Sequence, residues 1–257
     1  MTISIFNGEC ITEMKKMKDK SVDLFICDLP YGTTHFKWDT VIDLEEFWKQ
    51  FRRLRKHDRV ACIHFCDTKF GYTLIKSWEK GYKMDLILSK RHKTGGISSQ
   101  YRPLKNHESL YFFYDKTPKY NRDKYHKRIG AFEYDNPKNK TGGFGYSKTV
   151  KHSSLCFEPV QPGSIFNTTF STRNRFHPTE KGQDILEYLL KYWSDEGDVI
   201  LDPTMGSGST GVACKKINRG FVGIELDKKY YDICVSRLEI ETETDIDIET
   251  TTDFLLQ

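Results

Sequence analysis

An acidic residue, a turn and an aromatic residue follow an apolar run near the start of the chain, as Asp28-Leu29-Pro30-Tyr31 after residues 22–27. The Asp28 carboxylate can accept a hydrogen bond from an amino group, and the backbone carbonyl of Leu29 or Pro30 can accept a second one. Pro30 stiffens the turn, and Tyr31 can stack on a flat ring. Two acceptors held off the plane of a ring would free the lone pair of its amino nitrogen. We therefore predict that Asp28, Leu29, Pro30 and Tyr31 form a catalytic turn for an aromatic amine. Taken alone, the motif also fits a strand-ending turn with a solvent-facing Asp.

A glycine loop follows another apolar run late in the chain, as Gly206-Ser207-Gly208 with Gly211 in the next turn. Without a Cβ atom, Gly206 and Gly208 let the backbone approach a ligand closely. Gly211 would allow the helix that begins at about Ser209 to pack against the preceding strand. The spacing predicts a site for a nucleoside cofactor. A dinucleotide dehydrogenase or a tight structural turn would show the same spacing.

Two acidic residues beside the glycine loop narrow the choice of cofactor. Asp202, just before the loop, would repel a pyrophosphate and favour a cation such as a sulfonium. Glu225 follows the next apolar run, where its carboxylate can accept both hydroxyls of a ribose. We therefore predict S-adenosylmethionine rather than a dinucleotide. The predicted cofactor-binding residues in this part of the chain are Asp202, Pro203, Met205, Gly206, Ser207, Gly208, Glu225 and Leu226.

Seven apolar runs bounded by turn residues predict the strands that position these motifs. They cover residues 3–6, 22–27, 60–65, 84–88, 109–114, 199–201 and 221–224. Amphipathic helical patterns lie between most of them, at residues 44–54, 67–78, 185–193 and 230–238. This alternation predicts an α/β fold with a seven-stranded, mostly parallel Rossmann-like sheet and helices on both faces. No helical pattern separates residues 84–88 from residues 109–114, so we expect these two strands to pair antiparallel at the sheet edge.

The positive charge of the chain is concentrated between residues 115 and 158. This segment holds ten Lys or Arg against five Asp or Glu, whereas the whole chain has a net charge of +4. A basic insertion on a near-neutral body suggests a polyanionic partner, with a solvated basic surface as the alternative. The segment is too long for a simple loop in a compact domain, which predicts a small subdomain. Residues 241–257 form an acidic tail.

Composition argues against several other classes of protein. Seven cysteines without a Cys-x-x-Cys pair predict reduced thiols and no metal site. No run approaches the roughly 20 apolar residues that a membrane span needs. The first residues lack the charged start and long apolar stretch of a signal peptide. We therefore expect a cytoplasmic protein.

Together, and in this order, the two motifs resemble those of the amino-group DNA methyltransferases of the permuted β group, in which a D-P-P-Y turn precedes the cofactor loop. Residues 7–10 (N-G-E-C) are similar to the family's turn that reaches the cofactor adenine. Residues 102–108 (R-P-L-K-N-H-E) and 177–181 (H-P-T-E-K) are similar to its R-P-x-x-x-H-E and H-P-T-Q-K segments. The resemblance adds Glu9, Cys10, Asp28 and Lys181 to the expected cofactor site.

The resemblance implies methyl transfer from S-adenosylmethionine to adenine N6 of a base flipped out of double-stranded DNA, within a restriction-modification system. Asp28, where other members have Ser, is similar to the adenine-N6 enzymes, while Leu29 replaces the first proline and implies a looser turn. The alternatives are cytosine-N4 methylation, RNA adenine-N6 methylation and an inactive homologue that binds nucleic acid. The implied domain has a catalytic part (residues 1–114), a target-recognition insertion (115–165) and a cofactor-binding part (166–240). A homodimer is an alternative to a monomer.

Overall fold

The structure, a computed structural model, describes residues 2–30, 42–135, 151–169, 176 and 180–239. The predicted stacking residue Tyr31 therefore lies outside the described residues. The chain divides into two compact units. One unit combines Met1–Tyr120 with Ser164–Gln257, and the other is Asn121–Gly163.

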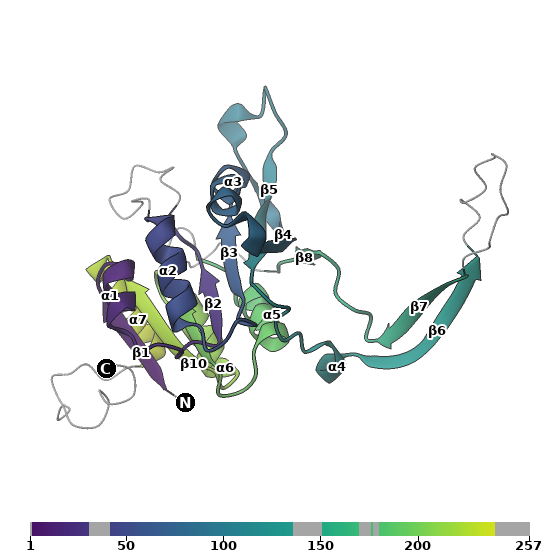
Figure 1. Cartoon of the computed structure of the whole chain (residues 1–257). Helices are drawn as coiled ribbons and strands as arrows, with labels where there is room; N and C mark the ends of the chain where they lie inside the picture. Colours follow the sequence, from purple (N-terminus) through teal and green to yellow (C-terminus); the bar gives the residue numbers. More distant parts are fainter. Residues whose placement is uncertain (1, 31–41, 136–150, 170–175, 177–179, 240–257) are drawn as a thin grey trace. The chain divides into compact units, whose positions relative to one another are not determined.

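Within the described residues, the first unit is built on a sheet of eight strands in the order β1-β10-β9-β2-β3-β5-β4-β8 (Figure 1). Every predicted strand is present, and the α/β architecture is confirmed. The predicted count of seven strands was wrong by one, because β8 has only three residues and pairs parallel with β4. So short a strand shows no hydrophobic periodicity in sequence. The strands are β1 Ile3–Asn7, β2 Leu24–Cys27, β3 Cys62–Cys66, β4 Tyr82–Thr94, β5 Lys105–Phe113, β8 Ile165–Asn167, β9 Val199–Asp202 and β10 Gly220–Glu225.

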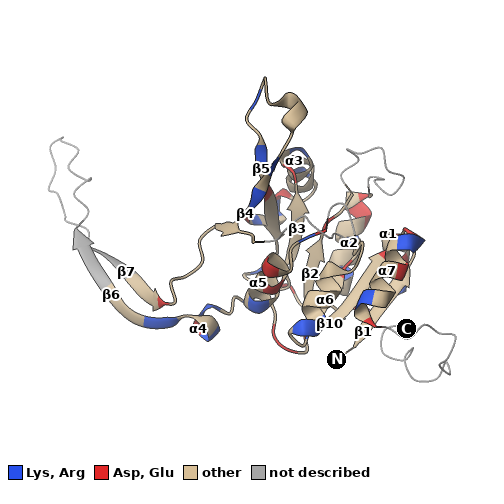
Figure 2. Ribbon diagram, turned by 180° about the vertical axis from the view of Figure 1, so that it is seen from behind, with Lys and Arg blue, Asp and Glu red and all other residues tan. Residues whose placement is uncertain are grey.

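Helices cover both faces of this sheet, with α1, α2 and α3 on one face and α5, α6 and α7 on the other (Figures 1 and 2). Their bounds are α1 Cys10–Lys16, α2 Leu44–Leu54, α3 Thr68–Ser77, α5 Gln183–Trp193, α6 Ser209–Lys216 and α7 Lys228–Leu238, with short 3₁₀ turns at Glu79–Gly81 and Gly96–Ser98. None of the helices in the described ranges is long and apolar enough to cross a membrane.

Side-chain caps start several of these helices. The Asp43 carboxylate accepts hydrogen bonds from the backbone N–H groups of Glu45 and Glu46 at the start of α2, and Asp67 accepts one from Phe70 at the start of α3. Helix α1 was not predicted, because its apolar pattern covers only seven residues.

The parallel strands β2, β3 and β10 are buried on both faces, which explains why their sequences are continuous apolar runs and not alternating patterns. All four residues of β2 are buried. On the face of α2, the ring of Trp48 contacts the rings of Phe47 and Phe51 at centroid distances of 5.1 and 5.8 Å. Cys27, Cys62 and His64 meet in the same core, with the two thiol sulfurs 3.8 Å apart. This core fixes β2 and β3, whose C-terminal ends carry the site described below.

Strands β4 and β5 pair antiparallel, as predicted, with Leu86 opposite Leu110 and Leu88 opposite Glu108. Both are longer than the predicted runs and continue as a hairpin beyond the sheet, with a register shift between Ser89 and Thr94. Only the three residues of β8 lie outside β4 in the sheet order.

The second unit lies within the range expected for the basic insertion. It holds the short helix α4 (Arg122–Tyr125) and an antiparallel pair of strands, β6 (Lys127–Asp135) and β7 (Lys151–Glu158). The Arg122 guanidinium lies 4.8 Å from the centroid of the Phe157 ring, which ties α4 to β7.

Candidate active site

The register of the sheet brings the two motifs to one edge. Strands β2 and β9 are parallel neighbours, with Phe25 opposite Leu201. Just past the ends of these strands, the Thr204 hydroxyl donates a hydrogen bond to the backbone carbonyl of Asp28 at 3.1 Å. The turn at Asp28 and the loop that leads to Gly206 are therefore in contact at the C-terminal ends of the strands, where α/β sheets bind ligands.

Asp28 is held by a lysine from a distant part of the chain. Lys181 Nζ lies 2.5 Å from Asp28 Oδ2 and 3.9 Å from Glu108 Oε2, and 5.0 Å from the centroid of the Phe65 ring. Burial opposes the charge on Lys181, but Asp28 and Glu108 outweigh it and raise the pKa of this lysine. Lys181, which the resemblance adds to the expected cofactor site, thus contacts the predicted catalytic acid in the structure.

Glu108 extends this network to the hairpin. Its second carboxylate oxygen pairs with Lys90 on β4. Burial opposes ionisation of Glu108, yet the charges of Lys181 and Lys90 prevail and lower its pKa. The sequence places Glu108 at the end of the R-P-L-K-N-H-E segment without indicating a role for it. Two lysines and two carboxylates therefore form one connected charge network, with Asp28 at one end.

The turn after Asp28 is anchored by a residue that departs from the family pattern. The Leu29 side chain is only 1% exposed and packs in the core cluster with residues of α2. Apolar packing at this position fixes the turn where a proline would have restricted it through its ring. Pro30 is half-buried. The turn at Asp28 and Leu29 is therefore fixed by core packing and by the bond from Thr204.

The glycine loop adopts backbone conformations that favour glycine. Gly206 has φ = 53° and Gly208 has φ = 79°. A Cβ atom on Gly208 would lie 2.3 Å from the sulfur of Cys234 in α7, and one on Gly211 would lie 2.7 Å from the Phe221 ring on β10. The backbone N–H of Met205 donates to the carbonyl of Ile224 at 2.9 Å, which holds the loop against β10. The expected close packing of α6 on the sheet at Gly211 is present.

Two buried carboxylates line this loop. Asp202 accepts hydrogen bonds from the Thr210 hydroxyl at 2.6 Å and the Thr204 backbone N–H at 3.2 Å. Glu225 accepts from the backbone N–H groups of Gly206 at 2.9 Å and Asp227 at 2.8 Å. Burial raises the pKa of Glu225.

Burial also raises the pKa of Asp202 to about 7, and the neighbouring charges of Asp28 and Glu225 add to the rise, against hydrogen bonds from Thr210 and Thr204. Between about pH 4 and pH 7 the folded protein therefore holds a proton that the unfolded chain has released. We therefore expect Asp202 to lower the free energy of unfolding as the pH rises through this range, by up to about 1.4 kcal/mol per pH unit. Urea unfolding of the wild type and of Asp202→Asn at several pH values would isolate this contribution as the difference between the two curves. Parallel curves would contradict it.

The turn at residues 7–10 reaches the same edge through β1. The side-chain amide of Asn7 donates to the carbonyls of Glu225 at 2.8 Å and Leu226 at 3.2 Å. Glu9 uses its carboxylate to cap α1, accepting from the N–H groups of Ile11 and Thr12. Burial opposes its ionisation, but these bonds lower its pKa. Cys10 is buried, whereas Leu226 is half exposed, with 52% of its surface accessible. The bonds from Asn7 thus hold the turn at residues 7–10 beside the end of β10, where Glu225 and Leu226 lie.

An ion pair that the sequence did not predict supports the loop from behind. Arg237 Nη2 lies 2.9 Å from Glu180 Oε1, and Arg237 Nη1 donates to the Ser207 carbonyl at 2.8 Å. The Ser209 hydroxyl donates to the same Glu180 oxygen at 3.1 Å. The only sequence signal was the position of Glu180 beside Lys181 in the H-P-T-E-K segment. Adjacent residues of that segment therefore hold the glycine loop and the turn at Asp28.

The residues at this edge fit a nucleoside cofactor that carries a positive charge. Gly206 and Gly208 permit close approach of a ligand, and the carboxylates of Asp202 and Glu225 suit a cation and ribose hydroxyls. Both carboxylates would repel a pyrophosphate. The Thr204 contact joins the turn at Asp28 to the glycine loop. A cofactor bound at the loop and an amine held at Asp28 would therefore be neighbours.

Comparisons with known proteins give one matching family and several similar proteins. The DNA methylase family matches residues 22–236 of the chain. The chain is similar to the type II methyltransferase M.HpaI of Haemophilus parainfluenzae, with 26% identity over 256 residues that cover 91% of this chain and 73% of that protein. It is similar in structure to M1.HpyAVI in complex with SAM, with a TM-score of 0.61, 23% identity and coverage of 93% of this chain and 100% of that one. The cytosine-N4-specific PvuII DNA methyltransferase has a TM-score of 0.66 at 12% identity, over 96% of this chain and 89% of that one. At these identities the solved structures establish a shared fold.

Proposed function

Because the chain belongs to the DNA methylase family, which it matches over residues 22–236, we propose that it methylates adenine N6 in double-stranded DNA. Membership establishes an amino-group DNA methyltransferase that acts on adenine N6 or cytosine N4. The family uses S-adenosylmethionine as its methyl donor. M.HpaI is a type II enzyme. We propose that this chain, too, is the site-specific modification enzyme of a restriction-modification system.

The contact between Thr204 and Asp28 carries the proposal, because it joins the amine site to the cofactor cradle. We assign the cofactor site to Asp202, Gly206, Gly208 and Glu225, with Glu9, Cys10, Pro203, Met205, Ser207 and Leu226 around them. When bound, S-adenosylmethionine supplies an electrophilic methyl group. The residues of the turn at Asp28 then have to hold the base so that the lone pair of its amino nitrogen points at this methyl group.

Asp28 performs this step by accepting a hydrogen bond from the exocyclic amine, while the carbonyl of Leu29 or Pro30 accepts the other. These acceptors favour a tetrahedral nitrogen and so make it nucleophilic. Lys181 holds the Asp28 carboxylate in place through an ion pair, since Lys181 Nζ and Asp28 Oδ2 lie 2.5 Å apart. Tyr31 is proposed to stack on the flipped base. The reaction is thus a displacement at a methyl group, promoted by positioning and by charge.

An acid at position 28 supports adenine as the base, because the sequence there is similar to the adenine-N6 enzymes. The decisive experiment incubates the protein with isotope-labelled S-adenosylmethionine and with DNA or RNA, digests the product to nucleosides and identifies the labelled one by mass. N6-methyldeoxyadenosine is the expected product. N4-methyldeoxycytidine would replace the adenine assignment, and labelled RNA nucleosides would replace the DNA assignment.

The basic residues of the second unit are proposed to set the register on DNA through phosphate contacts. Lys124, Lys127 and Arg128 are exposed there. Replacing all three with Ala should weaken duplex binding and flatten the plot of log affinity against log salt by about 0.9 for each phosphate that the variant no longer neutralises. Fluorescence anisotropy at several salt concentrations measures this slope.

A matched control uses three other exposed lysines, which lie on or beside helices α1 and α2. It replaces Lys15, Lys18 and Lys49 with Ala. This variant removes the same charge and should keep the wild-type slope. Equal slopes for both triple variants and the wild type would place target recognition elsewhere in the chain.

A further inference from the structure

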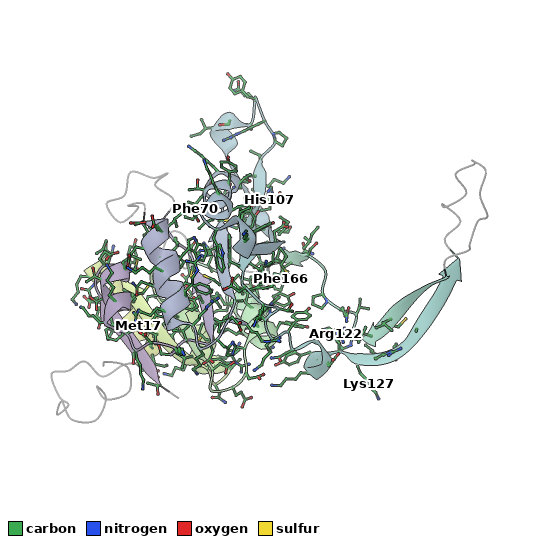
Figure 3. All side chains as sticks on the ribbon, viewed as in Figure 1. Met17, Phe70, His107, Arg122, Lys127 and Phe166 are labelled. Carbon is green, nitrogen blue, oxygen red and sulfur yellow. The ribbon has the colours of Figure 1, made fainter. Side chains whose placement is uncertain are left out.

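The hairpin of β4 and β5 continues past the sheet as an arm, defined here as residues 90–106. Its tip is ordered by backbone hydrogen bonds, from Ser98 N to Gly95 O at 3.0 Å and from Tyr101 N to Ser98 O at 3.0 Å. Gly95 has φ = 91° at the turn. Figure 3 labels His107, where the arm leaves the sheet opposite Ser89. The arm is therefore a defined β-ribbon and not a shapeless loop.

The surface of the arm combines exposed apolar side chains with positive charge. Ile97 is 99% exposed and Tyr101 is 86% exposed, both at the tip. The arm also contains five Lys or Arg and no Asp or Glu (Figure 2). Of these, Arg91, Lys93 and Arg102 are exposed. Exposed apolar side chains next to this excess of positive charge indicate a binding surface for an anionic partner.

The strand directions place the arm at the catalytic edge. Strand β5 is antiparallel to both β3 and β4, so β4 runs in the same direction as β2 and β3. The hairpin at the end of β4 therefore extends beyond the C-terminal ends of β2 and β3 (Figure 1). Asp28 directly follows β2. From Leu88 to Thr94 the strand continues for about 20 Å at roughly 3.3 Å per residue.

The base of the arm is linked to the turn at Asp28 through two intervening charged side chains. Lys90 on β4 pairs with Glu108 on β5, and Lys181 lies 3.9 Å from Glu108 and 2.5 Å from Asp28. A polymer that occupies the site at Asp28 would thus pass beside the arm.

We propose that the arm binds double-stranded DNA next to the target base, with Arg91, Lys93 and Arg102 on phosphates and Ile97 and Tyr101 against the bases. This inference rests on the proposed function. The major groove of B-form DNA, about 12 Å wide, admits a two-stranded ribbon, and apolar side chains can wedge between base steps. A second copy of this chain would instead bring a net charge of +4 against a basic arm.

The first test changes only the tip, with the double variant Ile97→Ser/Tyr101→Ser. Because both side chains are almost fully exposed, the fold should be unaffected, which thermal unfolding verifies. We expect the Kd for duplex DNA to rise at least about tenfold, as loss of a base-stacking aromatic does, with the Kd for S-adenosylmethionine unchanged. The matched control, Met84→Ser, changes an exposed apolar residue at the opposite end of β4 and should bind like the wild type.

The second test removes charge, with Arg91→Gln/Lys93→Gln against Lys83→Gln at the start of β4. Only the arm variant should lose duplex affinity, and the loss should be largest at low salt. Wild-type affinity for duplex DNA in both arm variants would overturn the proposal. So would a loss confined to double-stranded RNA or to self-association. Failure of the proposed function is a different result, since the wild type itself would then bind S-adenosylmethionine and methylate no DNA.

Discussion

Replacing Asp28 with Asn is expected to lower the turnover number for DNA methylation by roughly 10²–10³-fold, the range found when a preorganised group that stabilises a transition state is removed. In the proposed mechanism the carboxylate is the acceptor that draws the amine of the base out of conjugation, and Asn presents only one weaker acceptor oxygen. Cofactor affinity should stay within about twofold, because the contact to the loop uses the Asp28 backbone carbonyl and not its side chain. Single-turnover kinetics with saturating DNA, together with calorimetric binding of S-adenosylmethionine, measure both quantities.

The Asp28→Asn variant is also expected to lose stability, because it breaks the ion pair with Lys181. Removing the Asp28 charge leaves Lys181 with Glu108 at 3.9 Å as its remaining acidic neighbour among the ion pairs described. A half-broken buried pair destabilises a protein. The double variant Asp28→Asn/Lys181→Met should therefore regain thermal stability without regaining activity. Asp85→Asn, which removes an exposed carboxylate on β4, is the control for a general charge effect and should keep full turnover. Normal turnover in Asp28→Asn would exclude Asp28 from the mechanism.

Replacing Gly208 with Ala is expected to destabilise the fold and to abolish measurable cofactor binding. The new Cβ would lie 2.3 Å from the Cys234 sulfur, and the residue would keep φ = 79°. Overpacking of a core and a left-handed backbone together cost roughly 2–5 kcal/mol. The loop must move to relieve the clash, and its backbone then no longer lies where a bound cofactor would contact it. Urea unfolding and isothermal titration with S-adenosylmethionine measure the two effects.

Two variants separate the contributions of strain and clash. Gly197 also has a positive φ, of 83°, but a Cβ atom there would meet nothing within 4 Å. Gly197→Ala should therefore lose only the backbone contribution, roughly 1–2 kcal/mol, and should bind the cofactor normally. Gly208→Ala/Cys234→Ala removes the clashing sulfur and should recover part of the lost stability. If Gly208→Ala loses no more free energy of unfolding than Gly197→Ala, the contact with Cys234 of α7 does not account for the effect of the substitution.

The fold and the two motifs could be predicted from the sequence because their signals are local. The run at residues 22–27 and the loop around Gly206 are each set by a few consecutive residues, whose spacing reflects strand burial and turn geometry. The longer extent of β4 was missed, since its second half is exposed and polar and shows no apolar run. The short strand β8 was missed for want of length.

The sequence by itself determined the α/β class, the order of the motifs and the acid that each motif supplies. Tertiary structure alone decided which of these residues meet, since the bond from Thr204 to Asp28 spans 176 positions of the chain. The pairing of Lys181 with Asp28 depends on side chains from elements that only folding brings together. The raised pKa of Asp202 depends in the same way on burial by distant residues. The course of the arm beyond the end of β2 depends on the direction of β4 in the sheet. Local spacing cannot encode such contacts, because charge interactions and burial act through space and not along the chain.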